Sequence, residues 1–170
     1  MYREAVVKDS KVFCPVCGAL NMTLTGEEQM RNVRILCRKS KSNSEHFFIV
    51  NVGEEITKII EVDGQKLVLK YSFEAAEQKE LIQGLFKSMA NVCITPPNIS
   101  KLCSDSFYAG LLSVNPLPRI KADECMKAYM KIKNIDFESM FGELKELMKE
   151  SGFYNLSGLS DIAKLFDEEK

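Results

Sequence analysis

The chain has 170 residues, of which 45% are hydrophobic, enough for one domain or for a small module joined to a larger one. Its formal net charge of −1 excludes a uniformly basic nucleic-acid binder and also an acidic, solvating chain. No segment approaches the roughly 20 consecutive apolar residues that a membrane-spanning helix needs.

The N-terminal segment, Met-Tyr-Arg-Glu-Ala-Val-Val-Lys-Asp, is too short and too charged for a secretory signal. We therefore expect a cytoplasmic, intracellular protein whose cysteines are thiols or metal ligands. The even count of six cysteines leaves a secreted disulfide framework as the alternative.

The segment Phe-Cys-Pro-Val-Cys-Gly predicts a tight turn that points the sulfurs of Cys14 and Cys17 at one place. Pro15 stiffens this turn, and Gly18 permits a positive φ just after it. A redox-active pair is another interpretation, but such a pair lies at a helix N-terminus, and the residues that follow resemble a strand.

Residues 20–25 and 30–36 are typical of two strands joined by a turn over 26–29. If these strands pair, Cys17 lies opposite Cys37, and the hairpin brings a third sulfur to the first two. His46, the only histidine, begins a third apolar strand over 47–52. Three thiolates and one imidazole form a tetrahedral set that suits zinc, and a closed set of this kind is structural rather than catalytic.

Residues 12–52 resemble a zinc ribbon in three features: the Cys-Pro-x-Cys-Gly knuckle, the hairpin, and the second knuckle that leads into an aromatic strand. The last two ligands of such modules are usually about two residues apart, whereas eight residues separate Cys37 from His46. One of the later cysteines is therefore an alternative fourth ligand, although core packing is the better interpretation for all three: Cys93, Cys103 and Cys125.

A basic run without acidic residues follows one ribbon strand and its knuckle. These side chains are candidates for phosphate contacts, which would be sequence-independent and salt-dependent. A solvated loop with solubilising charge is the alternative. The run comprises Arg31, Arg34, Arg38, Lys39 and Lys41.

The segments 56–62 and 65–71 flank Asp63-Gly64, which predicts a hairpin with a two-residue type I′ turn. Helical periodicity begins after residue 72. We therefore expect an α+β protein: a small zinc-stapled antiparallel sheet with an extra hairpin over residues 1–72, then a helical domain over 73–170.

Apolar stripes and capping residues predict the helices. The first has Ser72 as its N-cap and stops at 95–97, and a later helix begins after Asp136 and stops at Gly152. The remaining helices are predicted around 98–103, 107–114, 125–130 and 156–166.

Residues 95–114 also resemble a helix-turn-helix unit, in which 107–112 would be the helix that reads DNA. This helix has no Arg, Lys, Gln or Asn through Val114, although base-edge contacts need such side chains. Gly110 also replaces a usual core aliphatic residue. We favour two short core helices.

The zinc-ribbon resemblance implies a nucleic-acid-associated protein, an accessory factor in transcription or another DNA transaction. Its partner would be nucleic acid or a nucleic-acid-processing protein complex, with no membrane and no small-molecule substrate. The alternative is a protein-interaction module in which zinc is purely structural. We do not expect an enzyme, because the sequence has no glycine-rich phosphate loop and no nucleophile elbow.

Overall fold

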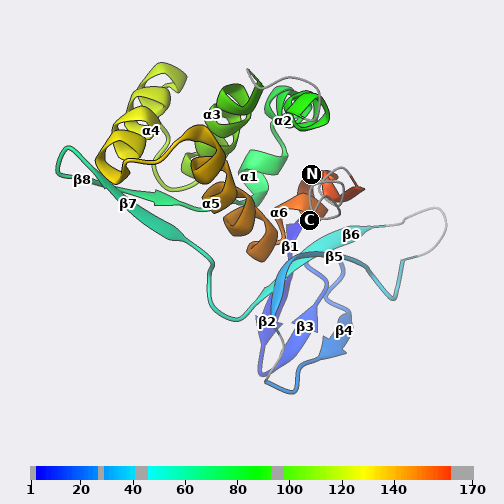
Figure 1. The fold of residues 1–170 in the computed structure, drawn as a ribbon. Helices are drawn as coiled ribbons and strands as arrows, with labels where there is room; N and C mark the ends of the chain where they lie inside the picture. Colours follow the sequence, from blue (N-terminus) through cyan, green and yellow to red (C-terminus); the bar gives the residue numbers. More distant parts are fainter. Residues whose placement is uncertain (1–2, 27–28, 41–45, 93–97, 162–170) are drawn as a thin grey trace. The chain divides into compact units, whose positions relative to one another are not determined.

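The computed structural model describes residues 3–26, 29–40, 46–92 and 98–161. It divides the chain into two compact units, residues 1–55 (the N-terminal unit) and 56–170 (the C-terminal unit). Small sheets form the first unit and helices dominate the second, so the predicted α+β class is confirmed (Figure 1).

The described part of the N-terminal unit contains two three-stranded sheets. In each sheet an antiparallel hairpin supplies two of the strands, and the buried side chains between the sheets include Val12, Phe48 and Val50. One sheet has the order β2 (Val6–Lys8), β3 (Lys11–Phe13), β4 (Leu20–Thr23), and the other has the order β1 (Arg3–Glu4), β6 (Phe47–Val52), β5 (Met30–Leu36).

The strand pairing differs from the prediction. Among the described residues β4 pairs with β3 and β5 pairs with β6, whereas the sequence predicted a hairpin between 20–25 and 30–36. The reason is that each cysteine turn itself reverses the chain. The N–H of Cys14 donates to the carbonyl of Ala19, and the N–H of Cys37 donates to the carbonyl of His46.

The hairpin of β7 (Lys58–Val62) and β8 (Gln65–Leu69) forms as predicted, with Val62 opposite Gln65. Asp63 and Gly64 both have a positive φ, which a type I′ turn requires. Ile60 and Leu67 are buried in the same core as the helices, so the hairpin belongs to the C-terminal unit. The sequence predicted a domain boundary between residues 72 and 73, whereas the division between the two compact units falls between Glu55 and Ile56.

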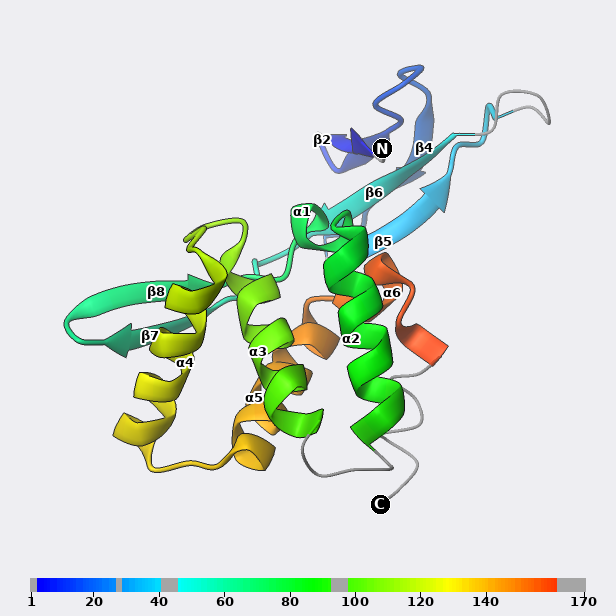
Figure 2. The ribbon, with the colours of Figure 1, turned by 90° about the horizontal axis from the view of Figure 1, so that it is seen from above.

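Helix α3 lies at the centre of the C-terminal unit, with α2 and α4 on either side of it and α5 packed against it (Figure 2). The Asp136 carboxylate accepts a hydrogen bond from the Ser139 N–H, as predicted for the N-cap of α5. The predicted stop at 95–97 and the end of the last predicted helix lie outside the described residues. The helices are α1 (Phe73–Ala76), α2 (Lys79–Val92), α3 (Asn98–Leu111), α4 (Arg119–Lys133), α5 (Phe137–Glu150) and α6 (Phe153–Ser157).

Helix α3 is continuous across the turn that both interpretations of residues 95–114 required. The prediction of a helix-turn-helix is therefore wrong, and so is the prediction of two separate helices. Gly110 faces strand β8, where a Cβ atom would lie 3.3 Å from a Leu69 methyl group, and its carbonyl accepts from the N–H of Lys70. Glycine at this position allows the helix and the hairpin to approach closely.

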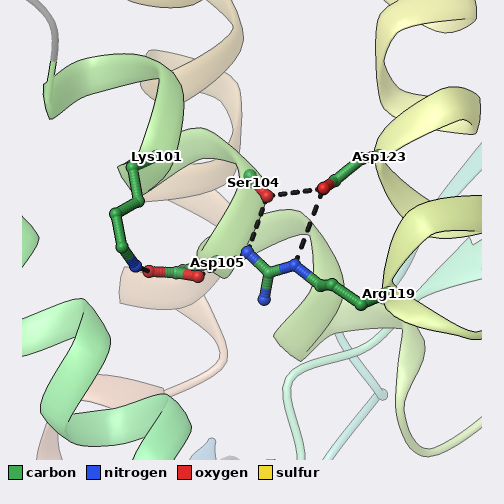
Figure 3. A network of polar contacts seen from close by, with 5 residues as sticks. All are labelled: Lys101, Ser104, Asp105, Arg119 and Asp123. Atoms are coloured by element: carbon green, nitrogen blue, oxygen red, sulfur yellow. Dashed lines mark hydrogen bonds and ion pairs between the residues drawn. The ribbon is translucent and has the colours of Figure 1, made fainter.

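A polar network joins α3 to α4 (Figure 3). The buried Asp105 carboxylate accepts from Lys101, at 2.6 Å, and from the Arg119 guanidinium. Arg119 also donates to the Ser104 hydroxyl at 2.6 Å, and that hydroxyl donates to Asp123. The network pairs two carboxylates with two cations, so Asp105 is buried with its charge balanced.

Candidate metal centre

The first cysteine turn holds two sulfurs at the end of the β3–β4 hairpin. The N–H of Gly18 donates to the carbonyl of Cys14 at 2.9 Å, and Gly18 has a φ of +68°. The N–H of Val16 points to the Cys14 sulfur at 3.4 Å. The Cys-Pro-Val-Cys-Gly sequence thus folds locally as predicted, with Cys14 buried and Cys17 exposed.

The second turn brings Cys37 and His46 together at the end of the β5–β6 hairpin. Besides the bond between Cys37 and His46, the N–H of Ser40 donates to the Cys37 carbonyl at 2.9 Å. The N–H of His46 donates to the Ser40 hydroxyl at 2.9 Å. These bonds tie Cys37 and Ser40 to His46 across residues 41–45, which lie outside the described residues.

The two turns bring all four predicted ligands into one cluster. One ligand atom from each of Cys14, Cys17, Cys37 and His46 lies within 4.8 Å of the other three. The sulfurs of Cys17 and Cys37 are 3.6 Å apart. Zinc–sulfur bonds of about 2.3 Å in a tetrahedral site place two sulfurs about 3.8 Å apart, so this separation fits a shared zinc ion.

The two buried thiols of the cluster differ in acidity. Burial raises the pKa of Cys14. At Cys37, burial also acts to raise the pKa, but the Lys39 N–H and the neighbouring Cys17, Cys14 and Asn21 groups outweigh it and lower the pKa to about 6. The thiolate is the form of cysteine that binds metals, so the turn favours the ligating state of Cys37.

Two of the later cysteines, considered as alternative ligands, lie in the core of the C-terminal unit. Cys103 and Cys125 are both buried there, and the Cys103 thiol donates to the Phe137 carbonyl at 3.1 Å. Burial raises the pKa of Cys103 to about 12, which disfavours the thiolate. Cys93 lies outside the described residues.

The predicted basic residues have different environments. The Arg31 guanidinium donates to the carbonyls of Met30 and Val52 and is thereby part of the β5–β6 hairpin. The exposed Arg34 guanidinium lies over the Phe47 ring, 3.9 Å from its centroid. Arg38 and Lys39 are exposed in the second turn, and Lys41 lies outside the described residues. Among the described members of the run, Arg31 is therefore partly engaged within the hairpin, whereas Arg38 and Lys39 present charge to solvent.

Asn21 is a residue of the site that sequence reasoning did not find. Its side-chain nitrogen donates to the Ala19 carbonyl at 2.7 Å and lies 3.9 Å from the Cys37 sulfur. Its side-chain oxygen accepts from the N–H of Arg38 at 2.8 Å. One buried amide therefore links the two turns. The only sequence signal was a polar residue inside a predicted strand, which is too common to indicate a role.

No family model, no curated protein and no solved structure matches this chain. The candidate functional site is therefore argued from the structure alone: it is the four-residue cluster beside the small antiparallel hairpins. Within the described ranges, every helix is too short or too polar to cross a lipid bilayer.

Proposed function

We propose that the N-terminal unit is a zinc-ribbon-like module in which one structural zinc ion joins the two cysteine turns. The support is the chemistry and closeness of the four donors, since three thiolates and an imidazole are typical structural zinc ligands. Four protein ligands leave no open position for water, so the proposed metal organises the sheets and performs no reaction.

We further propose that the module contacts nucleic acid through Arg38 and Lys39. The observation that carries this proposal is the hydrogen bonding of the second turn. The N–H of Arg38 is bonded to Asn21, and that of Lys39 interacts with the Cys37 sulfur, so the site fixes both backbones while both side chains stay exposed. Cations held in this way suit phosphate contacts, which position a nucleic acid without reading its sequence.

The test is the affinity of the zinc-loaded chain for labelled nucleic acid at rising salt. We expect binding that weakens steeply with salt and that is largely lost when Arg38 and Lys39 are both changed to Ala. Changing Lys8 and Lys11 to Ala is the matched control, since both are exposed cations of the same unit. Equal losses in the two double variants would contradict a localised contact.

A protein-interaction module is the second candidate function, and one surface favours it. Val6, Phe13 and Leu20 are cross-strand neighbours on the face of the β2–β3–β4 sheet opposite the buried Val12. Val6 is 53% exposed and Leu20 is 45% exposed. No nucleic-acid binding at low salt by the zinc-loaded protein would favour this candidate over the first.

A further inference from the structure

One face of the β5–β6 hairpin places a planar cation, an aromatic ring and an exposed apolar side chain together. Leu36 is opposite Phe47, and Arg34 is opposite Ile49, so Arg34, Leu36 and Phe47 share a face. The other face carries Ile35, Phe48 and Val50 and packs into the core. The first face is exposed only at the end of the hairpin near the second cysteine turn, where Leu36 is 46% exposed, whereas Ile49 further along the same face is 2% exposed.

The Arg34 guanidinium is stacked rather than extended. It lies 3.9 Å from the centroid of the Phe47 ring, which is partly buried. The ring holds the planar cation against the sheet and reduces the entropy lost when a second planar group stacks on it. Strand β5 ends at Leu36, and the chain then enters the turn that exposes Arg38 and Lys39.

These groups match the two parts of an unpaired nucleotide. Exposed bases stack on aromatic rings and on arginine guanidinium planes, whereas the phosphates need cations nearby. A base inside a duplex is already stacked on its neighbours and cannot reach such a platform. We propose that the exposed end of this face binds single-stranded nucleic acid, with a base stacked on the Arg34–Phe47 pair and adjacent phosphates near Arg38 and Lys39.

This inference rests on the proposed nucleic-acid function and narrows it to one class of ligand. The test measures fluorescence anisotropy of the zinc-loaded full chain with four probes of equal length: oligothymidylate, oligouridylate, an abasic strand and a DNA duplex. We expect the two base-bearing strands to bind about tenfold more tightly than the abasic strand and the duplex, the size of effect that one lost base stack produces. The first two probes distinguish DNA from RNA.

The decisive variant is Arg34→Lys, which keeps the charge and removes the planar surface. We expect it to weaken binding of the base-bearing strands about tenfold and to leave binding of the abasic strand unchanged. Phe47→Leu should act in the same way, and Lys11→Ala is the control for general charge. Arg34 is exposed, so the lysine variant should keep its zinc content, which is measured alongside the binding.

The outcomes separate this inference from the proposed function. If all four probes bind equally and Arg34→Lys has no effect, while the double change of Arg38 and Lys39 abolishes binding, the single-strand inference is wrong and the phosphate contact stands. If the wild type binds none of the probes at low salt, both are wrong and the exposed face serves a protein partner.

Discussion

Among the residues that are not candidate ligands, Asn21 links the two cysteine turns of the candidate metal centre. Its amide bonds to the first turn through Ala19 and to the second turn through Arg38 and the Cys37 sulfur. Hydrogen-bonded neighbours of this kind orient metal ligands and tune their basicity. The side chain is 3% exposed, so water cannot replace these bonds without a structural change.

We predict that Asn21→Ala lowers zinc affinity by about tenfold to a hundredfold, the usual cost of losing a hydrogen-bonded neighbour of a ligand. The reason is that the second turn loses its anchor, and the Cys37 thiolate loses a donor. Competition with a chromophoric chelator measures the affinity. Thr23→Ala, an exposed change on the same strand, should leave it unaltered. An unchanged affinity for the Asn21 variant would show that the cysteine turns position themselves.

The clustering of the four candidate ligands could be predicted from the sequence, whereas the position of Asn21 beside them could not. Cysteine and histidine are uncommon and bind metals through their own side chains, so their types and spacing are informative. Asn21 acts through the backbone atoms and the sulfur that the fold brings to it. The same holds for Phe47, whose position under Arg34 follows from the register of β5 and β6.

At the scale of elements, the network between α3 and α4 offers a test of packing. Asp105 has a side chain that is 6% exposed, whereas its partners Arg119 and Lys101 are 36% and 61% exposed. If the carboxylate is removed, both cations can turn to water, so the cost is smaller than for a fully buried pair.

We predict that Asp105→Ala destabilises the C-terminal unit by about 1.5–3 kcal/mol, the range for hydrogen bonds to a charged group. Urea unfolding followed by helical circular dichroism measures the midpoint. Asp123→Ala provides the comparison, because its side chain is 34% exposed and a solvent-facing ion pair contributes about 0–1 kcal/mol. Equal effects of the two changes would contradict a special role for the buried carboxylate.

The N-cap of α5 gives a prediction that depends on pH. The Ser139 N–H donates to the Asp136 carboxylate at 2.8 Å and lowers the pKa of that carboxyl. A carboxyl with a lower pKa in the folded state stabilises the fold above its unfolded pKa, and loses that effect as the pH falls through the folded value. We therefore expect Asp136→Ala to lower the melting temperature at neutral pH, by an amount that shrinks in acid below about pH 4, the usual aspartate range.

The matched comparison is Asp136→Asn, measured by the same thermal unfolding. Asparagine also caps helices well but carries no charge. This variant should therefore retain most of the stability of the wild type, and its difference from Asp136→Ala should not change with pH. If the difference in melting temperature between Asp136→Asn and Asp136→Ala changes with pH as strongly as the difference between the wild type and Asp136→Ala, the carboxyl charge does not cause the pH dependence.

The sequence patterns of strands and helices predicted local structure well, but they predicted poorly which strands pair with each other. The Asp63-Gly64 hairpin was predicted correctly because its turn and both strands are adjacent in the chain. The pairing of 20–25 with 30–36 was wrong, since alternation indicates which face is buried but not which strand is the neighbour. Helix α3 was predicted as two pieces because Ser104-Asp105-Ser106 resembled a turn with a capping serine, whereas these residues lie inside one continuous helix.

At the scale of the whole molecule, the two units have cores of different kinds. The described core of the C-terminal unit joins the β7–β8 hairpin to the helices through many large side chains, among them Leu85, Phe107 and Phe153. The described core of the N-terminal unit is small and includes two of the predicted ligands, Cys14 and Cys37. A unit of this size buries too little apolar surface for ample stability, so a bound metal would supply much of it.

We therefore predict that a strong zinc chelator unfolds the N-terminal unit and leaves the C-terminal unit folded. Hydrogen exchange with mass spectrometry should show fast exchange in peptides from residues 1–55 after chelation, with protection restored when zinc is added back. Peptides from 56–92 and 98–161 should keep their protection, and helical circular dichroism should change little. Loss of protection in both units would show that they fold cooperatively, while unchanged exchange in residues 1–55 would show that the four clustered side chains hold no structural metal.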